Sequence, residues 1–303
     1  SMPAARLVFL VFFGVAVMYF YKIVNLLWGE TTAQLSTLVY LSLPLSLFYS
    51  RAIHIDFFVV AATHVMFYHY LKGVKELAWK HMMWSSLAAT LAFLIKAPYA
   101  YYFVFPMLWY AEKQQAVMFV LRTGRLYLLA ILPFWLWQEH AHYINNAMPD
   151  LGYIAHYRKM INNEHWYFGT WEQRLTPYPW KVLLQRGVFD VAGVGGVLFM
   201  LLGLSRLKEQ RLLLYWMLGL VIYVLVFFNL NAVHNYYQIP LLAPVAVLCA
   251  WGLAMTKKPL PFFALLIVLN FLYVEKFYYK IENTHVDIGR VIRENTPNSA
   301  LVV

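Results

Sequence analysis

Three ionisable side chains stand close together between two long apolar stretches, in the segment SRAIHID. Charged groups at the end of an apolar stretch need water, a partner or a ligand to receive them. Arg51 and His54 can reach an interface with their long or amphipathic side chains, but Asp56 is short. Asp56 either caps the helix that follows, or it lines a water-filled cavity. In the cavity, Arg51 would bind an anion and Asp56 would position a hydroxyl group or a metal ion.

A second candidate is Lys96, in the segment LIKAPYAYYF. Lys96 either extends outward from an apolar helix or belongs to a fixed turn. Pro98 favours the turn, because the residue before a proline is disfavoured in helical conformation. A lysine ammonium in such a turn would suit a phosphate group as a point charge.

A third group lies in NLNAVHNYYQIP, where amides, tyrosines and a histidine alternate. Tyrosine by itself is ordinary at a membrane interface. A histidine and several amides among the tyrosines predict a pocket wall that hydrogen-bonds a polar ligand.

The longest polar stretch, residues 139–186, carries a fourth group of cations and histidines: His140, His142, His156, Arg158, Lys159, His165 and Arg174. His140 and His142 could begin a metal site, but the sequence offers no third ligand at a known spacing. A connection of this length is usually functional or disordered, and its aromatic content argues against disorder. We expect short amphipathic helices lying over the ends of the membrane spans.

The composition defines the surroundings of these groups. The chain of 303 residues is 62% hydrophobic and 13% charged, with a mean hydropathy of +0.58, which is too apolar for a soluble domain. The sequence therefore predicts an all-α polytopic membrane protein. The single cysteine, Cys249, implies no disulfide framework or metal cluster. The net charge of +10 is spread over short loops, which favours contact with anionic lipid over nucleic acid.

About ten transmembrane helices are predicted by apolar runs near 5–22, 33–50, 56–71, 82–95, 98–111, 124–138, 187–204, 212–229, 239–255 and 261–275. Lysine and arginine concentrate in every second loop, at 72–80, 113–125, 206–211 and 257–258, which predicts that these loops are cytoplasmic. SRAIHID and the stretch 139–186 then face outward. The predicted domains are a transmembrane domain over 1–275 and the start of a soluble outer region over 276–303.

Four of these segments resemble the GT-C membrane glycosyltransferases of the dolichyl-phosphate-mannose–protein mannosyltransferase type, a group that includes the lipid A aminoarabinose transferase. SRAIHID is similar to a Ser-Arg…Asp element of the family, and IKAP is similar to its Lys-Gly-Pro element, with Ala97 in place of glycine. HWYFGTWEQRLTPYPW resembles an outer-loop segment. VHNYYQIPLLAPVAVLCAWGLA resembles a His-x-Tyr-Tyr…Pro…Pro pattern.

The resemblance implies transfer of a sugar from a polyprenyl-phosphate donor to a lipid, glycan or protein acceptor at the outer face of a bacterial inner membrane. The resemblance also implies that the catalytic aspartate of the family is missing from this chain. The family's catalytic aspartate, often in an Asp-Glu or Asp-Asp pair, lies in an outer loop after the first span, and this chain begins beyond that loop. We expect a fragment that is inactive alone and whose soluble C-terminal region is cut off.

For this chemistry the sequence offers an acid, several cations and a pocket wall. Asp56 is the predicted catalytic acid, which orients the acceptor or holds a metal ion. Asp56→Asn is expected to abolish transfer and to leave folding nearly unchanged. The predicted partners of the donor phosphate are Arg51, Lys96, Arg158 and Arg174. The predicted sugar or acceptor pocket consists of His54, His234, Asn235, Tyr236 and Tyr237. No cofactor is predicted with certainty, and a divalent metal ion stays open.

The alternative function is a transporter or flippase for lipids or polar solutes. Such a protein is expected to carry ionisable residues near the middle of several spans, and His64 and His69 are the candidates for that role. Most of the polar groups instead collect at one face of the predicted membrane domain, which favours catalysis at the interface.

Overall fold

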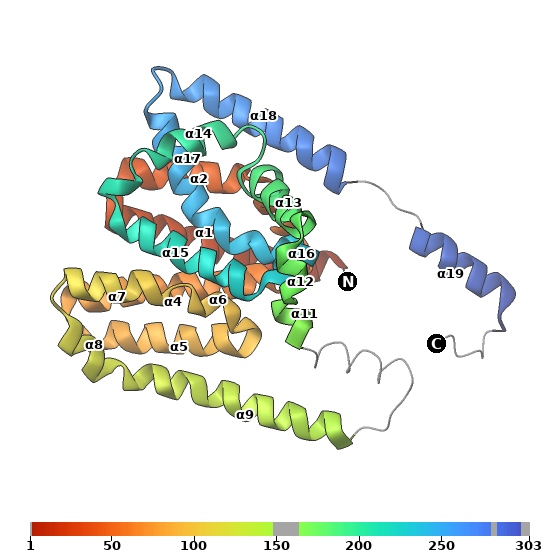
Figure 1. Ribbon diagram of the computed structural model, residues 1–303, viewed down its shortest axis with the longest axis horizontal. Helices are drawn as coiled ribbons and strands as arrows, with labels where there is room; N and C mark the ends of the chain where they lie inside the picture. Colours follow the sequence, from red (N-terminus) through yellow and green to blue (C-terminus); the bar gives the residue numbers. More distant parts are fainter. Residues whose placement is uncertain (1, 148–163, 280–283, 298–303) are drawn as a thin grey trace.

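The computed structural model describes residues 2–147, 164–279 and 284–297, and every regular element within these ranges is helical (Figure 1). The first part of the chain forms α1 (Met2–Trp28), α2 (Glu30–Ser42), α3 (Pro44–Tyr49), α4 (Asp56–Glu76), α5 (Trp79–Lys96), α6 (Pro98–Tyr101), α7 (Val104–Lys113), α8 (Val117–Thr123) and α9 (Arg125–Ala147). Successive long helices pack side by side in this part, α1 on α2 and α4, and α5 on α4 and α9.

The second part of the chain consists mostly of shorter helices with frequent interruptions between them. It forms the short helices α11 (Glu164–Phe168), α12 (Trp171–Leu175) and α13 (Pro177–Gln185), the π-helix η1 (Arg186–Ala192) and α14 (Val197–Leu204). It continues through η2 (Leu207–Glu209), α15 (Arg211–Val226), α16 (Phe228–Val233), η3 (Asn235–Leu241), α17 (Leu242–Ala254), α18 (Pro259–Tyr278) and α19 (Thr284–Asn295).

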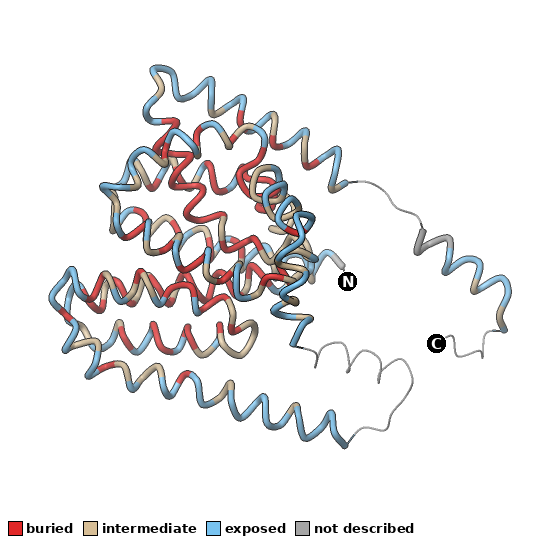
Figure 2. Tube along the Cα trace, viewed as in Figure 1, coloured by how far each residue is buried: buried red, intermediate tan, exposed pale blue. Residues whose placement is uncertain are grey.

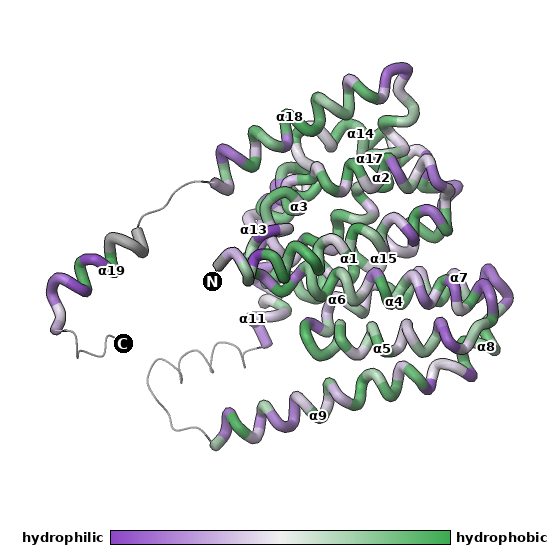
Figure 3. Tube along the Cα trace, turned by 180° about the vertical axis from the view of Figure 1, so that it is seen from behind, coloured by the Kyte–Doolittle hydropathy of each residue, from purple (hydrophilic) through white to green (hydrophobic). Residues whose placement is uncertain are grey.

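Helix α17 lies at the centre of the bundle. Every residue from Leu242 to Leu253 is buried, and α17 packs on α2 and α14. Helices α1, α9 and α18 instead leave many large apolar residues exposed, and the tubes of α9 and α18 are mostly pale blue, the colour of exposed residues (Figure 2). Hydrophilic residues gather at the turn between α7 and α8 and near α11 (Figure 3). Large exposed apolar faces between two polar ends are what a lipid environment requires.

Four helices are long and apolar enough to cross a membrane: Pro3–Trp28, Val117–Ala147, Asn235–Ala254 and Pro259–Tyr278. A bent pair, Pro177–Ala192 with Val197–Leu204, would make a fifth, and its two halves meet at 97°. Each segment predicted as a span does contain helix. The predicted number of about ten exceeds the four to five that meet the length and composition test.

Several predicted spans are interrupted for identifiable reasons. The stretch 33–50 divides into α2 and α3 at Leu43, because Pro44 follows and occupies the first position of the new helix. The stretch 98–111 divides into α6 and α7, and Pro98 and Pro106 each stand in the first turn of one of these helices. The chain turns between η1 and α14 at Gly193, whose φ of +73° favours glycine.

Small residues allow α14 and α17 to approach closely. A Cβ on Gly252 would lie 2.0 Å from the Phe199 carbonyl oxygen, and one on Gly203 would lie 2.0 Å from the Leu248 carbonyl oxygen. Contacts of this kind bring helix backbones together in apolar surroundings, where hydrophobic association is weak.

The predicted outer stretch 139–186 begins differently from the expectation. Helix α9 continues to Ala147, because residues 134–147 include no glycine or proline that would end it. Short helices then cover 164–185, as the sequence predicts for this stretch. The terminal strand-like ALVV lies outside the described residues.

Candidate active site

The SRAIHID segment links α3 to α4, at the end of the bundle where α6 and η3 also contact α4. This arrangement brings the first three predicted groups together. Asp56 starts α4, Lys96 ends α5, and Tyr236 and Tyr237 come from η3. The three segments are far apart in the sequence, so only the tertiary fold makes one site of them.

Asp56 is almost completely buried, with 1% of its surface exposed. Its Oδ1 accepts a hydrogen bond from the Lys96 ammonium at 2.6 Å and another from the Tyr99 hydroxyl. Its Oδ2 pairs with Nδ1 of His54. A buried carboxylate is tolerated only when its charge is matched in this way.

Lys96 lies in an aromatic cage. Its Nζ is 3.6 Å from the centre of the Tyr237 ring, 4.4 Å from that of Tyr99 and 5.1 Å from that of Tyr236. Ring faces attract a desolvated cation, and the Asp56 carboxylate neutralises it. Lys96 therefore has a different partner from the phosphate predicted for it. Its role toward a phosphate stays a prediction.

The Asp56 side chain does not cap the helix that follows it, which was the structural alternative for this residue. Ile55 is the N-cap of α4, and no side chain caps that end of the helix. The Asp56 side chain points instead to His54, Lys96 and Tyr99. Its charge still stands in the first turn of α4, where the helix dipole favours an anion.

His54 is the accessible member of the cluster, with 30% of its side chain exposed against 1% for Asp56. Its ring packs on Tyr236 with centroids 4.4 Å apart, and His234 stacks on the same tyrosine at 4.9 Å. Burial lowers the pKa of His234 below its usual value, and the positive charges of Arg186 and Lys96 and the proximity of His54 lower it further. His234 is therefore neutral near pH 7.

A series of hydrogen bonds holds η3 in place, the element whose Tyr236 and Tyr237 form the tyrosine wall beside Lys96. The Tyr49 hydroxyl donates to Asn235 at 2.8 Å, and the Asn235 amide donates to the Tyr278 hydroxyl at 2.8 Å. The last member of this hydrogen-bond series is Asp190, which accepts a hydrogen bond from the Tyr273 hydroxyl at 2.7 Å and is hydrogen-bonded to Tyr278. Asn235 thus positions the wall, in addition to its predicted place in the pocket.

Arg186 binds the residues just before η3. Its guanidinium donates to the carbonyl of Asn231 at 2.6 Å and to that of Val233 at 3.1 Å. Arg186 and Asp190 were not among the site residues predicted from the sequence. Their signal is the pair of opposite charges four residues apart at the start of an apolar run, in RGVFD.

Arg51 remains near the surface, away from the Asp56 cluster. Its guanidinium lies over the Tyr279 ring at 4.7 Å and donates to the Tyr279 hydroxyl. It lines a cavity of about 620 Å³ together with Arg6, Phe48 and Tyr279. Two arginines and two aromatic rings form a surface suited to a phosphate group. Arg6 was not predicted from the sequence, because Arg51, which lines the same cavity, is far from it along the chain.

The cations of the long polar stretch are placed differently. Arg174 donates to the Phe168 carbonyl at 2.6 Å and lies over the Phe228 ring at 4.8 Å, so its guanidinium holds the local fold. Arg158, with His156 and Lys159, lies outside the described residues. His140 and His142 are two apart on α9 and therefore point to different sides of the helix, which separates the suggested metal pair.

The donor set of the site does not favour a metal ion. Within the described ranges, no group of three or more histidine, cysteine, aspartate or glutamate side chains is placed to hold one. Both oxygens of Asp56 already have partners within the protein.

The bundle of apolar helices indicates an integral membrane protein, with a polar cluster at one end of the bundle. Residues 1–137 match the family model of dolichyl-phosphate-mannose-protein mannosyltransferase, which confirms the resemblance for this part of the chain. The matched part includes Arg51, His54, Asp56 and Lys96. It ends before VHNYYQIP, so the resemblance of that segment stays a prediction. Neither the curated proteins nor the solved structures include a significant match to the chain.

The description of this family model names a glycosyltransferase, and the match covers residues 1–137 of 303. The match does not define the acceptor, the side of the membrane or the residues that react.

Proposed function

We propose that this chain is part of an enzyme that transfers a sugar from a polyprenyl phosphate to an acceptor at the outer face of a membrane. The buried cluster of Asp56, Lys96, Tyr99 and His54 carries the proposal. It lies at the end of the bundle opposite the basic loops that follow α4 and α7. By the distribution of positive charge, that end faces outward. A bacterial inner membrane and about ten spans, some of them made of short consecutive helices, are part of the proposal.

Asp56 is too buried to touch an acceptor directly while its present contacts hold. We assign it the role of fixing and polarising the His54 imidazole, as a carboxylate does when it orients a histidine base. His54 then exchanges a proton with the acceptor hydroxyl at the open side of the cluster. In a longer protein, the acid of the first outer loop would share this work. The chain alone is therefore expected to be inactive.

The donor phosphate is assigned to the surface formed by Arg51 and Arg6. Both arginines line the same cavity, and a guanidinium can bind a phosphate through two parallel hydrogen bonds. Lys96, which is paired with Asp56, and Arg158 and Arg174 remain candidates for further contacts. The sugar would lie against His54, His234 and the tyrosine wall, with Asn235 holding the wall in place.

An apolar groove offers a place for part of the lipid chain. It has a volume of about 250 Å³ and runs between α6, α7 and α15, with Tyr101, Phe105 and Ile222 among its walls. It also includes Tyr223, whose hydroxyl donates to the Tyr237 carbonyl at 2.9 Å. The groove therefore borders the aromatic cage around Lys96.

The transporter alternative gains little from the structure. Nδ1 of His64 is 2.9 Å from the carbonyl oxygen of Ala16, in the buried interface of α1 and α4. His69 pairs with His81 of α5 at 2.9 Å. Both histidines join neighbouring helices, which is a packing role and not that of a solute path.

The test is a transfer assay with the full-length protein and with this chain, each given a polyprenyl-phosphate sugar and a mixture of outer-face acceptors. We expect the full-length protein to release polyprenyl phosphate and this chain to release none.

Arg51→Gln with Arg6→Gln should raise the KM for the donor strongly. The matched control, Arg122→Gln with Arg206→Gln, removes the same charge from exposed positions elsewhere. Lack of any release by the full-length protein would contradict the proposal.

A further inference from the structure

A second polar cavity lies at the end of the bundle opposite the Asp56 cluster. It has a volume of about 620 Å³ and is walled by three segments: the end of α1, the end of α7 with the turn that follows, and the start of α15. Trp28 and Gln210 join two of these walls, since the Trp28 indole donates to the Gln210 side chain at 2.9 Å. The third wall is anchored by Trp109, which stacks on Tyr215.

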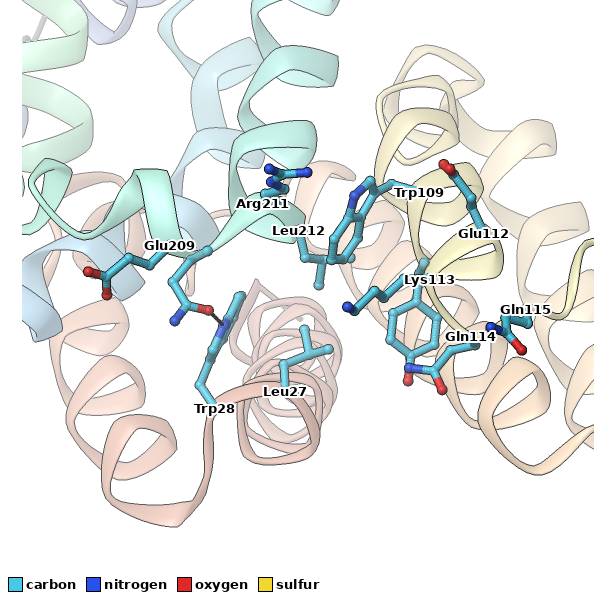
Figure 4. A pocket seen from close by; sticks show the side chains of 12 residues that line it. Leu27, Trp28, Trp109, Glu112, Lys113, Gln114, Gln115, Glu209, Arg211 and Leu212 are labelled. Atoms are coloured by element: carbon cyan, nitrogen blue, oxygen red, sulfur yellow. Dashed lines mark hydrogen bonds between the residues drawn. The ribbon is translucent and has the colours of Figure 1, made fainter.

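The charged residues that line this cavity are the cations Lys113 and Arg211 and the carboxylates Glu112 and Glu209. Figure 4 shows the Lys113 ammonium directed toward the space between Leu27 and Trp109, and Arg211 on another wall at the start of α15. The carboxylates of Glu112 and Glu209 are turned away from that space (Figure 4). Among the described residues, no carboxylate lies within ion-pair distance of Lys113 or Arg211. Two cations that share a cavity without an acidic partner are suited to an anion.

The surroundings of the cavity indicate where the anion comes from. Its walls are the ends of apolar helices, and two tryptophans line it, as is usual at the level of lipid headgroups. The next helix, α8, leaves Val117, Met118 and Leu121 exposed beside the turn that closes the cavity. Acyl chains can cover these side chains while a headgroup occupies the cavity. A free anion would leave this apolar surface uncovered.

We propose that this cavity binds the phosphate headgroup of an anionic phospholipid from the leaflet that faces the basic loops. Lys113 and Arg211 bind the phosphate, Trp28 and Trp109 enclose the headgroup, and the chains lie along α8. Basic pockets between membrane helices on the cytoplasmic side bind lipid headgroups in this manner. The proposal is independent of the transfer reaction at the other end of the bundle.

The experiment measures lipid binding to the purified chain in neutral detergent, by native mass spectrometry and by thermal stabilisation. Short-chain phosphatidylglycerol is the probe, and phosphatidylcholine and inorganic phosphate are the comparison ligands. Lys113→Gln with Arg211→Gln is expected to weaken phosphatidylglycerol binding about tenfold or more, because each cation near the headgroup adds to the affinity.

The matched control is Lys80→Gln with Lys257→Gln. It removes two exposed cations from the same end of the bundle outside the cavity, and it should change binding less than about twofold. Equal loss in the two double variants, or equal binding of phosphatidylcholine, would overturn the proposal. Protection by inorganic phosphate equal to that by phosphatidylglycerol would show a site for a soluble anion and would also overturn the assignment to a lipid.

Discussion

Asp56 and Lys96 belong both to the packing of the bundle and to the site proposed above. Their ion pair is buried on both sides, with 1% and 9% of the side chains exposed. Removing one member of such a pair leaves an unmatched charge, which costs about 3–5 kcal/mol, whereas replacing both can be nearly neutral. The single substitution Asp56→Asn therefore cannot separate a structural role from a functional one.

We predict that Asp56→Asn lowers the stability of the chain in detergent by about 3 kcal/mol, because Lys96 is left uncompensated. This differs from the sequence-based expectation of nearly unchanged folding. Asp56→Asn combined with Lys96→Met should recover most of the loss, as measured by thermal unfolding. In the transfer assay of the proposed function, the double variant should fold and yet stay inactive. Recovery of transfer in the double variant would show that Asp56 only balances the charge of Lys96.

The neutral state of His234 leads to a pH prediction. Its pKa lies below 6.5 in the folded protein, so the unfolded chain binds a proton first as the pH falls. Stability should therefore decrease as the pH drops below about 6.5, until the folded-state pKa is passed. His234→Gln should flatten this part of the profile of thermal unfolding against pH. His140→Gln, on an exposed part of α9, is the control and should leave the profile as in the unmodified chain.

At the scale of the elements, close backbone approach decides where helices can meet. Helices α14 and α17 touch through Gly203 and Gly252, and a side chain at either position would collide with a backbone oxygen of the other helix. Backbone atoms cannot move aside as the end of a flexible side chain can, so the two helices would have to separate. Since α17 carries the chain from η3 into the core, their separation would also shift the tyrosine wall.

Gly252→Ala is therefore predicted to destabilise the protein by about 2 kcal/mol or more, the range of overpacking in a dense core. Gly14→Ala in α1 is the matched control, because no atom lies within 4 Å of the Cβ it would add. It should be neutral or stabilising by about 0.5–1 kcal/mol, since alanine is the better helix former. Thermal unfolding of both variants in the same detergent checks the prediction. Similar effects from the two substitutions would contradict the packing argument.

At the scale of the whole molecule, the two ends of the bundle differ in chemistry. One end holds the Asp56 cluster and the surface of Arg6 and Arg51, and the other holds the basic turns and the cavity of Lys113 and Arg211. Helix α1 connects the two ends: Arg6 and Trp28 are separated by roughly 30 Å at 1.5 Å per residue. That distance matches the thickness of the hydrocarbon layer.

We predict that Lys75 and Glu172 lie on opposite sides of the membrane. Both are exposed, and the native thiol is buried, so single cysteines at these positions can be labelled in a Cys249→Ser background. A membrane-impermeant maleimide applied to intact cells should label Glu172→Cys and should label Lys75→Cys only after permeabilisation. Labelling of both from outside would show that the orientation or the number of spans is wrong.

The sequence by itself was sufficient for the apolar environment and the helical class, and it selected residues 51, 54, 56 and 96 as candidates for the site. Apolar run length and composition act locally and identify buried or lipid-facing helices wherever they occur. Pro98 likewise marked a helix break in advance, whereas the break before Pro44 interrupts a stretch that was predicted as one span. The resemblance in the first part of the chain rests on the same short motifs.

The tertiary structure alone decided which partners these residues have. Lys96 pairs with a carboxylate forty positions away and enters a cage completed by Tyr236 and Tyr237. Arg6 joins Arg51, and Arg186 holds the carbonyls behind the wall. Pairing across such separations depends on how the helices cross, and the crossing is set by packing along their whole length. A local sequence pattern carries no record of it, so the sequence showed which groups could react and the fold determined which of them meet.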